Sequence, residues 1–204
     1  MKNKVVTTTA VLLLPCFILV SCLKNQTKYF ADEQDKGLTI FSNTGDNIFS
    51  CYINDMPWRT VNRRTGGFLI GPRSEIHLYK EPDSTMGTTL VIEWDGNFTN
   101  DPNNFDRITL HLAVPADFSN HDLNNFEEKR ITIDSTNGYF TMNVSGINTN
   151  AKGTGNIYFN KASVKSTGQD ISGMLSGLLE ADFPGAKITK GRFDHQLTYV
   201  QVEF

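Results

Sequence analysis

The sequence predicts a single all-β domain, an antiparallel β-sandwich with a partly open β-barrel as the alternative, and with room for one short helix. Two observations carry this prediction. First, runs of residues alternate between apolar and polar side chains, which is the pattern of strands that bury one face. Second, short clusters of Gly, Asn and Asp separate the runs, as in turns between neighbouring strands. The chain has 204 residues, which is enough to bury a sizeable core in one domain.

The alternating runs follow one another through most of the chain. In the clearest, 107–114, every second residue from Ile108 to Val114 is apolar. Successive side chains of a strand point to opposite faces, so these apolar residues face the core together. The runs that we expect to form strands are 49–53, 75–80, 89–94, 107–114, 130–135, 139–144 and 156–160.

Two segments between the runs have a structure of their own. Asn137-Gly138 lies between two alternating runs and predicts a tight hairpin, because both central residues of a type I′ turn need positive φ. Residues 118–128 predict one short helix or a long loop, because a few apolar residues recur there at helical spacing.

The N-terminus has the layout of a secretory signal. Two lysines precede the apolar run 11–20, and the small residue Ser21 stands directly before Cys22. The apolar run is about ten residues long, whereas a membrane-spanning helix needs roughly 20. We therefore expect residues 1–21 to be a lipoprotein signal peptide.

The tetrapeptide Leu19-Val20-Ser21-Cys22 resembles the bacterial lipobox. In such signals the cysteine sulfur is lipidated, the peptide is cut before it and the new amino group is acylated, which implies acyl chains such as palmitate on Cys22. Several chains anchor a protein stably where one does not. Leu23 stands where the enterobacterial rule for inner-membrane retention requires Asp, so we expect an outer-membrane lipoprotein of the cell envelope, on its periplasmic or its surface side. The alternative is an ordinary secretory signal with an incidental Cys22.

Composition sets the organisation of the remaining chain. Residues 22–36 are polar with little periodicity and predict the lipidated cysteine followed by a flexible tether, while 37–204 form the single all-β domain. The chain has 22 acidic and 19 basic residues and a formal net charge of −3. Nucleic-acid binding rewards clustered Lys and Arg, so we expect no nucleic-acid partner.

The cysteines do not predict a disulfide. Cys16 leaves with the signal and Cys22 is modified, so Cys51 has no partner in its own chain. Its position in the run 49–53 favours a buried small apolar residue over a reactive thiol.

Several short motifs resemble a Bacteroidota family of small lipoproteins of unknown function, the DUF6252-like group. Its members carry a lipobox, an early V-N-G-x-x-W hairpin, an I-S-G strand and a closing I-T-x-G-x-F-D hairpin. Here the matching segments are 53–58, 171–173 and 188–194, with Asp55 where Gly is usual. The resemblance implies an all-β domain and no activity. It also favours a strand for the first half of 171–183, where periodicity alone leaves helix and strand open.

No motif assigns catalytic residues, a metal or a cofactor. The oxygen-rich stretch 95–106 does not match the register of a calcium loop, so we expect a polar loop there. His77 and His111 would meet if their strands paired. An enzyme would bring two or three carboxylates and histidines together in one cleft, and the candidates for this are Glu75, His77, His111, Asp117, Asp194 and His195. Glycoside hydrolysis needs two facing carboxylates, for which Glu93 is also available.

The aromatic residues predict both a core and a surface. Trp58 and Trp94 are expected to be core anchors rather than a sugar-stacking platform. Tyrosine combines apolar area with a polar group and suits contacts with glycans or proteins. The candidate binding surface consists of the tyrosines on the outward faces, Tyr52, Tyr79, Tyr139 and Tyr158. We therefore expect a lipid-anchored, non-catalytic binding or structural accessory of the cell envelope, with a hydrolase of envelope glycans as the alternative.

Overall fold

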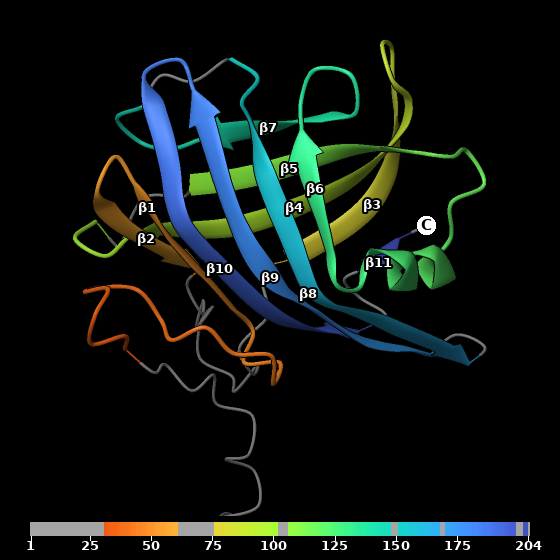
Figure 1. Ribbon diagram of the computed structural model, residues 1–204, viewed down its shortest axis with the longest axis horizontal. Coiled ribbons are helices and arrows are strands. Elements are labelled where there is room, and N and C mark those ends of the chain that lie inside the picture. Colours follow the sequence, from red (N-terminus) through yellow and green to blue (C-terminus); the bar gives the residue numbers. More distant parts are fainter. Residues whose placement is uncertain are drawn as a thin grey trace, which may run out of the picture.

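The computed structural model of the chain describes residues 31–60, 76–101, 106–147, 151–167, 170–198 and 202–203. Within them the chain forms one almost entirely antiparallel sheet that is nearly closed into a barrel, together with one short 3₁₀ helix (Figure 1). The all-β prediction is confirmed, and the single connected sheet corresponds to the barrel alternative rather than to two separate sheets. The predicted signal peptide 1–21 and Cys22 lie outside the described residues.

Most predicted runs are strands, and several extend further than expected. The strands are β1 (Ile48–Ile53), β2 (Met56–Thr60), β3 (Ile76–Asp83), β4 (Gly87–Phe98), β5 (Asp106–Val114), β6 (Lys129–Ile133), β7 (Gly138–Asn143), β8 (Thr154–Thr167), β9 (Asp170–Phe183), β10 (Ala186–Thr198) and β11 (Val202–Glu203). Their order in the sheet is β11-β3-β4-β2-β1-β10-β9-β8-β6, and β5 pairs with both β4 and β7. In Figure 1 the strands β8, β9 and β10 cross in front of β3 and β5.

The barrel closes because its two sides meet at both margins. At one margin β2 pairs with the end of β4, so that Trp58 lies opposite Phe98. At the other margin Phe140 of β7 exchanges two backbone hydrogen bonds, of 2.9 and 2.8 Å, with Gly153 just before β8. A closed sheet has few exposed strand edges and can fill its interior with side chains.

Bulges bend the long strands around this interior. The pairing of β8 with β9 shifts register between Phe159 and Lys161, and that of β10 with β9 shifts between Ile188 and Gly191. A β-bulge adds a residue to one strand and increases the local twist. Gly177, on β9, permits close packing at this point, because a Cβ there would lie 2.0 Å from the carbonyl oxygen of Tyr158.

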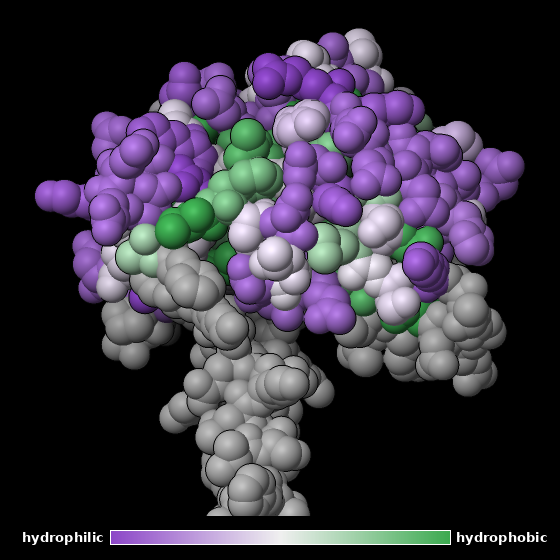
Figure 2. Space-filling model, turned by 60° about the horizontal axis from the view of Figure 1, so that its bottom comes forward, coloured by the Kyte–Doolittle hydropathy of each residue, from purple (hydrophilic) through white to green (hydrophobic). Residues whose placement is uncertain are grey.

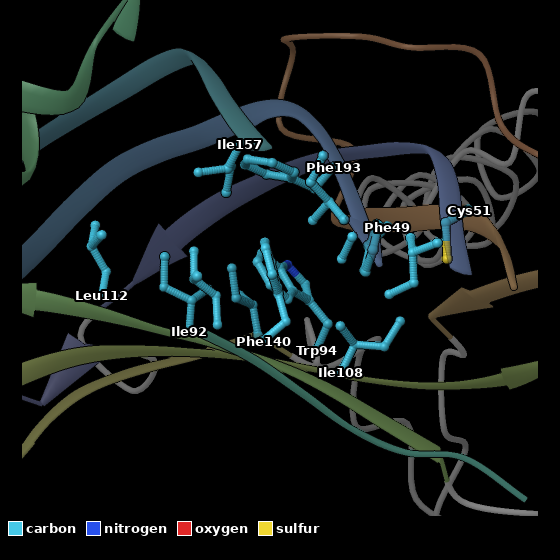
Figure 3. Packing of buried hydrophobic residues seen from close by; sticks show 14 of the residues in the cluster. Phe49, Cys51, Ile92, Trp94, Ile108, Leu112, Phe140, Ile157 and Phe193 are labelled. Atoms are coloured by element: carbon cyan, nitrogen blue, oxygen red, sulfur yellow. The ribbon is translucent and has the colours of Figure 1, made fainter. Parts of the chain in front are cut away.

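The interior of the barrel is aromatic. The ring centroid of Trp94 lies 5.1 Å from that of Phe49 and 5.6 Å from that of Phe193 (Figure 3). The ring centroid of Phe49 in turn lies 5.5 Å from that of Trp58. Both tryptophans are fully buried, which confirms that they are core anchors. Aromatic pairs at these separations stabilise the core beyond their buried area alone.

The 3₁₀ helix η1 (Asn120–Phe126) lies within the segment predicted to be a short helix or a loop. The backbone N–H of Ser119 donates to the Asp122 carboxylate at 2.8 Å, which satisfies a donor at the start of the helix. Phe126, at the end of η1, stacks on Phe159 of β8 with ring centroids 5.3 Å apart. The helix therefore packs on the core through its aromatic side.

The structure corrects three details of the predicted strands and turns. The whole of 171–183 is strand within β9, rather than its first half alone. Asp95-Gly96-Asn97, the start of the expected polar loop 95–106, lies within β4, opposite the first residues of β5. The pairing of β4 with β5 includes these residues, and its last pair is Gly96 with Asp106.

The predicted hairpin at Asn137-Gly138 is also wrong. Neither residue has a positive φ, and the flanking strands pair elsewhere, β6 with β8 and β7 with β5. The turn forms earlier, because the Asp134 carboxylate accepts the backbone N–H of Thr136 at 2.8 Å. The type I′ geometry occurs instead at Asn54 and Asp55, with φ of 48° and 64°, in the β1–β2 hairpin.

His195 is fully buried on the inward side of β10, between Asp194 and Gln196, which face outward. Burial lowers the pKa of this imidazole to about 3, from an ordinary value of 6.5. The folded protein thus keeps His195 neutral in a pH range where the unfolded chain takes up a proton. The stability contributed by the neutral imidazole is present above pH 6.5 and is lost as the pH falls toward 3.

We expect the free energy of unfolding to fall by about 2 kcal/mol between pH 7 and pH 5 on account of His195 alone. Replacement His195→Gln removes the titrating group and should flatten this dependence. The matched control is His77→Gln on the exposed side of β3, which should keep the dependence of the unsubstituted protein. Urea unfolding at the two pH values measures the difference, and equal slopes for His195→Gln and the unsubstituted protein would contradict this assignment.

Candidate functional site

The outward side of β3, β4, β5 and β7 carries a set of interacting polar side chains, and we call it the polar face. It comprises Tyr79, Glu81, Asp83, Glu93, Asp95, Arg107, His111 and Tyr139, with Lys152 beside them. Strand register places Tyr79, Val91, His111 and Tyr139 in one row, because each lies opposite the next across the sheet. Two of the four predicted binding tyrosines, Tyr79 and Tyr139, therefore share one row.

Tyr139 is the centre of one half of the polar face. Its ring stacks on His111 with centroids 4.3 Å apart, and the Nζ of Lys152 lies 3.6 Å from the ring centroid. Its hydroxyl donates to Asp83 at 3.1 Å, across β5 and β4 to β3. The Nδ1 of His111 lies 3.0 Å from the Glu81 carboxylate. These contacts hold the tyrosine flat against the sheet.

The surroundings of Tyr139, His111 and Asp83 determine the protonation states of these three side chains. Burial and the bond to Asp83 raise the pKa of Tyr139 to about 12, so the hydroxyl remains a donor. Burial lowers the pKa of His111, and the nearby Glu81 opposes this effect without reversing it. Hydrogen bonds from the hydroxyl and backbone N–H of Thr85 lower the pKa of Asp83. At neutral pH the imidazole is therefore neutral and the Asp83 carboxylate is ionised.

Arg107 organises the other half of the polar face. Its guanidinium lies 2.6 Å from Asp95 through Nε and 2.9 Å from Glu93 through Nη1. The hydroxyl of Tyr79 donates to Glu93 at 3.1 Å, and burial together with the Glu93 charge raises the pKa of Tyr79 to about 12. Arg107 remains 44% exposed, whereas both carboxylates are 13% exposed. The guanidinium of Arg107 is therefore accessible to solvent, while the two carboxylates that bind it are largely covered.

The polar face offers contacts of fixed geometry. Its carboxylates are engaged by neighbouring donors, and its two tyrosines retain their protons over the physiological range. An arrangement of this kind suits hydrogen bonding and charge pairing with a polar ligand or with a protein.

The other two predicted tyrosines lie on the remaining strands of the barrel. The hydroxyl of Tyr52, on β1, donates to the carbonyl oxygen of Lys36 at 3.0 Å. Tyr158, on β8, lies opposite Leu178 of β9 and Arg130 of β6. The four tyrosines, which were predicted to form one surface, therefore do not share one: Tyr79 and Tyr139 share a row, while Tyr52 and Tyr158 lie on β1 and β8, with β10 and β9 between them.

The candidate catalytic and metal-binding residues are dispersed. His77 on β3 and His111 on β5 are separated by β4, so they do not meet. Asp194 is buried between β10 and the segment 44–46, which donates backbone N–H groups to it, while the next residue, His195, points into the core. Glu75 lies outside the described residues. In the part of the chain that the structure describes, no group of three or more His, Cys, Asp or Glu side chains is placed to hold a metal ion.

Cys51 occupies the position expected for a buried small apolar residue. Its side chain is fully buried in β1, within the aromatic core (Figure 3). Burial also raises the pKa of the thiol, which disfavours the reactive thiolate.

A second group of hydrogen bonds and ion pairs attaches the segment N-terminal to β1 to the outside of the barrel. Residues 31–47, which we call the strap, run over the outward sides of β1 and β10. Leu38 is fully buried there, and the backbone N–H of Thr39 donates to the Ser50 hydroxyl at 3.1 Å. The predicted tether 22–36 thus ends in six described residues, 31–36, that belong to the strap.

Arg192 on β10 clamps the start of the strap. Its Nη1 lies 2.6 Å from Asp32 and 2.8 Å from the carbonyl oxygen of Thr39, and its Nη2 bonds Asp35. Lys190 also pairs with Asp35. The hydrogen bond from Arg192 is the largest influence that lowers the pKa of Asp32, and that from Lys190 is the largest for Asp35. Both strap carboxylates are therefore held ionised against β10.

Asp194, two residues further along β10, holds the end of the strap. Its carboxylate accepts the backbone N–H groups of Thr44 at 3.0 Å, Gly45 at 2.9 Å and Asp46 at 3.2 Å. The hydroxyl of Ser42 also donates to it. Successive N–H groups that converge on one carboxylate form a compact anion-binding turn. The role of this acidic candidate is thus structural.

The sequence does not reveal the strap, because its attachments join distant parts of the chain. Asp32 and Arg192 are 160 positions apart. The available signal was the acidic character of Asp32 and Asp35 in an otherwise polar segment, which is also typical of a solvated tether.

Comparison of the chain with models of protein families, with curated proteins and with solved structures found no match.

The described residues include no helix with the length and apolar character needed to cross a bilayer.

We expect Arg192→Ala to release the start of the strap, because it leaves Asp32 and Asp35 without their shared cation. The cost is about 1.5–3 kcal/mol, the range for hydrogen bonds to charged groups. Chymotrypsin, which cuts after Phe41, should then cleave the native protein faster. Lys190→Ala removes one exposed ion pair and should change the cleavage rate little. Equal cleavage rates for Arg192→Ala and the unsubstituted protein would contradict the clamp.

Proposed function

We propose that this protein is a lipid-anchored component of the cell envelope, held at the outer membrane through Cys22, and that it serves as a non-catalytic binding or structural accessory. The lipobox-like sequence before Cys22 and the resemblance to DUF6252-like lipoproteins support the anchor and its location. A glycan or another envelope protein is the proposed partner of the polar face.

The strap is the observation that carries this proposal. Ala31, its first described residue, is nine positions after Cys22, and nine extended residues reach at most about 30 Å. A lipid on Cys22 would therefore keep the barrel close to the membrane surface. The clamp by Arg192 and the bonds to Asp194 join the anchored end of the chain firmly to the barrel wall. Such an attachment suits a protein that works at a fixed distance from a membrane.

The polar face supports a role in contact rather than in catalysis. Its charged groups are paired within the face, as in the bonds of Arg107 to Glu93 and Asp95. Its histidine stacks on Tyr139. Groups held in this way have fixed positions, which lowers the entropy lost when a ligand binds. The face lies on β3, β4, β5 and β7, whereas the strap lies on β1 and β10, and the side chain of Arg107 on this face is 44% exposed.

The anchor is tested by growing cells that express the full chain with a clickable palmitate analogue. We expect the label on the unsubstituted protein, and its loss from Cys22→Ala, because the acylated sulfur is then absent. The matched control is Cys51→Ala, which changes a cysteine buried in the core and should keep the label. A protein that stays unlabelled, or a label that persists in Cys22→Ala, would refute the proposed anchor.

The binding role is tested by thermal unfolding of the detergent-solubilised full chain with fragments of envelope glycans and with solubilised envelope proteins. A ligand at 100 times its Kd stabilises the native state by about 2.7 kcal/mol. We expect either the glycan fragments or the envelope proteins to raise the melting temperature of the protein, with a rise that saturates as the ligand concentration increases. Arg107→Ala should lose most of this rise, because the exposed cation of the polar face is gone. Lys187→Ala, at an exposed position on β10, should keep it. An equal rise for Arg107→Ala and the unsubstituted protein would exclude the polar face as the contact surface.

A further inference from the structure

Exposed apolar side chains gather at the strap. In the described part of the chain, the large hydrophobic residues that remain exposed are Ile40 at 51%, Phe41 at 36%, Met56 at 41% and Leu178 at 41%. Isolated exposed apolar residues are common, whereas a group of them marks a site of contact with a protein or a membrane. Figure 2 shows hydrophobic surface among hydrophilic side chains on this side of the molecule.

Three of these residues, Ile40, Phe41 and Leu178, lie on the strap or next to it, and we call them the strap surface. Ile40 and Phe41 follow Thr39, which is held by Ser50 and Arg192. Leu178 lies opposite Arg192 in the β9–β10 pairing. Met56 lies apart from this surface, because Pro57 faces Gly37 of the strap and the preceding side chain of β2 points to the opposite face.

We infer that the strap surface rests on the lipid bilayer, an inference that depends on the lipid anchor proposed above. The chain enters the strap at Ala31, which forms a β-bridge with Thr39, the residue before Ile40. The exposed apolar pair thus lies beside the point from which nine residues lead back to Cys22. A lipid on that cysteine would bring the membrane within about 30 Å of Ala31, and the apolar side chains closest to this point are those of the strap.

The chemistry of the strap surface fits the interfacial region of a bilayer. Apolar side chains on a peripheral protein insert about 5–10 Å, to the boundary of headgroups and acyl chains. The neighbouring lysine side chains, Lys187 and Lys190, are 58% and 56% exposed and can remain among the headgroups. Contact at the strap would add a second membrane attachment to the acyl chains and fix the barrel's orientation, with the polar face turned away from the bilayer.

The test uses the full-length lipoprotein reconstituted into phosphatidylcholine vesicles with brominated acyl chains, which quench tryptophan fluorescence at short range. Phe41→Trp introduces the probe on the strap surface, at a position exposed enough to accept the larger ring. The matched control is Asn143→Trp, at an exposed position of β7 on the side of the polar face. The native tryptophans are buried in the core and give an equal background in both variants.

We expect bromolipid to reduce the fluorescence of Phe41→Trp and its emission to shift to shorter wavelength, while Asn143→Trp shows neither change. Equal behaviour of the two probes would overturn the inference. So would an emission shift of Phe41→Trp that requires added envelope protein, because the surface would then bind a protein. Acyl labelling and flotation of the same samples separate the two proposals. Labelled, floating protein without selective quenching refutes the bilayer contact alone, whereas unlabelled protein refutes the anchor.

Discussion

The structure depends on the closure of one sheet around an aromatic core. β1 pairs with β2 on one side and with β10 on the other, so it links the N-terminal part of the sheet to the C-terminal part. This pairing brings Phe49 and Phe193 to the same interior as Trp94. Because the inward positions are filled with large apolar side chains, the barrel wall is rigid and its interior is a packed core. The polar groups must therefore act on the outside of the wall.

The outside of the wall carries two different chemical surfaces. On β3, β4, β5 and β7, the alternation of the strands sets acids, a histidine and two tyrosines in register, and they satisfy one another across the sheet. On β1 and β10 the outward groups are used to hold the strap, through the Arg192 guanidinium and the Asp194 carboxylate. The polar groups of the first surface are thus bonded to one another, whereas those of the second join the barrel to the segment that precedes it. This division follows from the period of two in each strand and from the order of the strands in the sheet.

The sequence predicts the local features of this molecule well and its long-range features poorly. The alternation of 107–114 identified β5 and its inward face, since that pattern depends on neighbouring residues alone. The hairpin at Asn137-Gly138 failed because Asp134 offers a competing turn and because β6 and β7 pair with other strands. The row formed by Tyr79 and Tyr139 could not be predicted without knowing that β4 and β5 lie between them. The strap was missed for the same reason, since its binding sites are on a strand from the far end of the chain.

The position of those binding sites determines the order in which the molecule can be completed. Arg192 and Asp194 lie on β10, so the surface that receives the strap does not exist until β10 has paired with β1 and β9. Contacts between residues so distant in sequence form slowly, because a long loop must close first. The strap, although among the first parts of the domain to be synthesised, is thus among the last to find its place. The strap can bind only after the barrel has formed. A chain whose C-terminal strands are incomplete would therefore keep an unattached N-terminal segment that proteases can cleave.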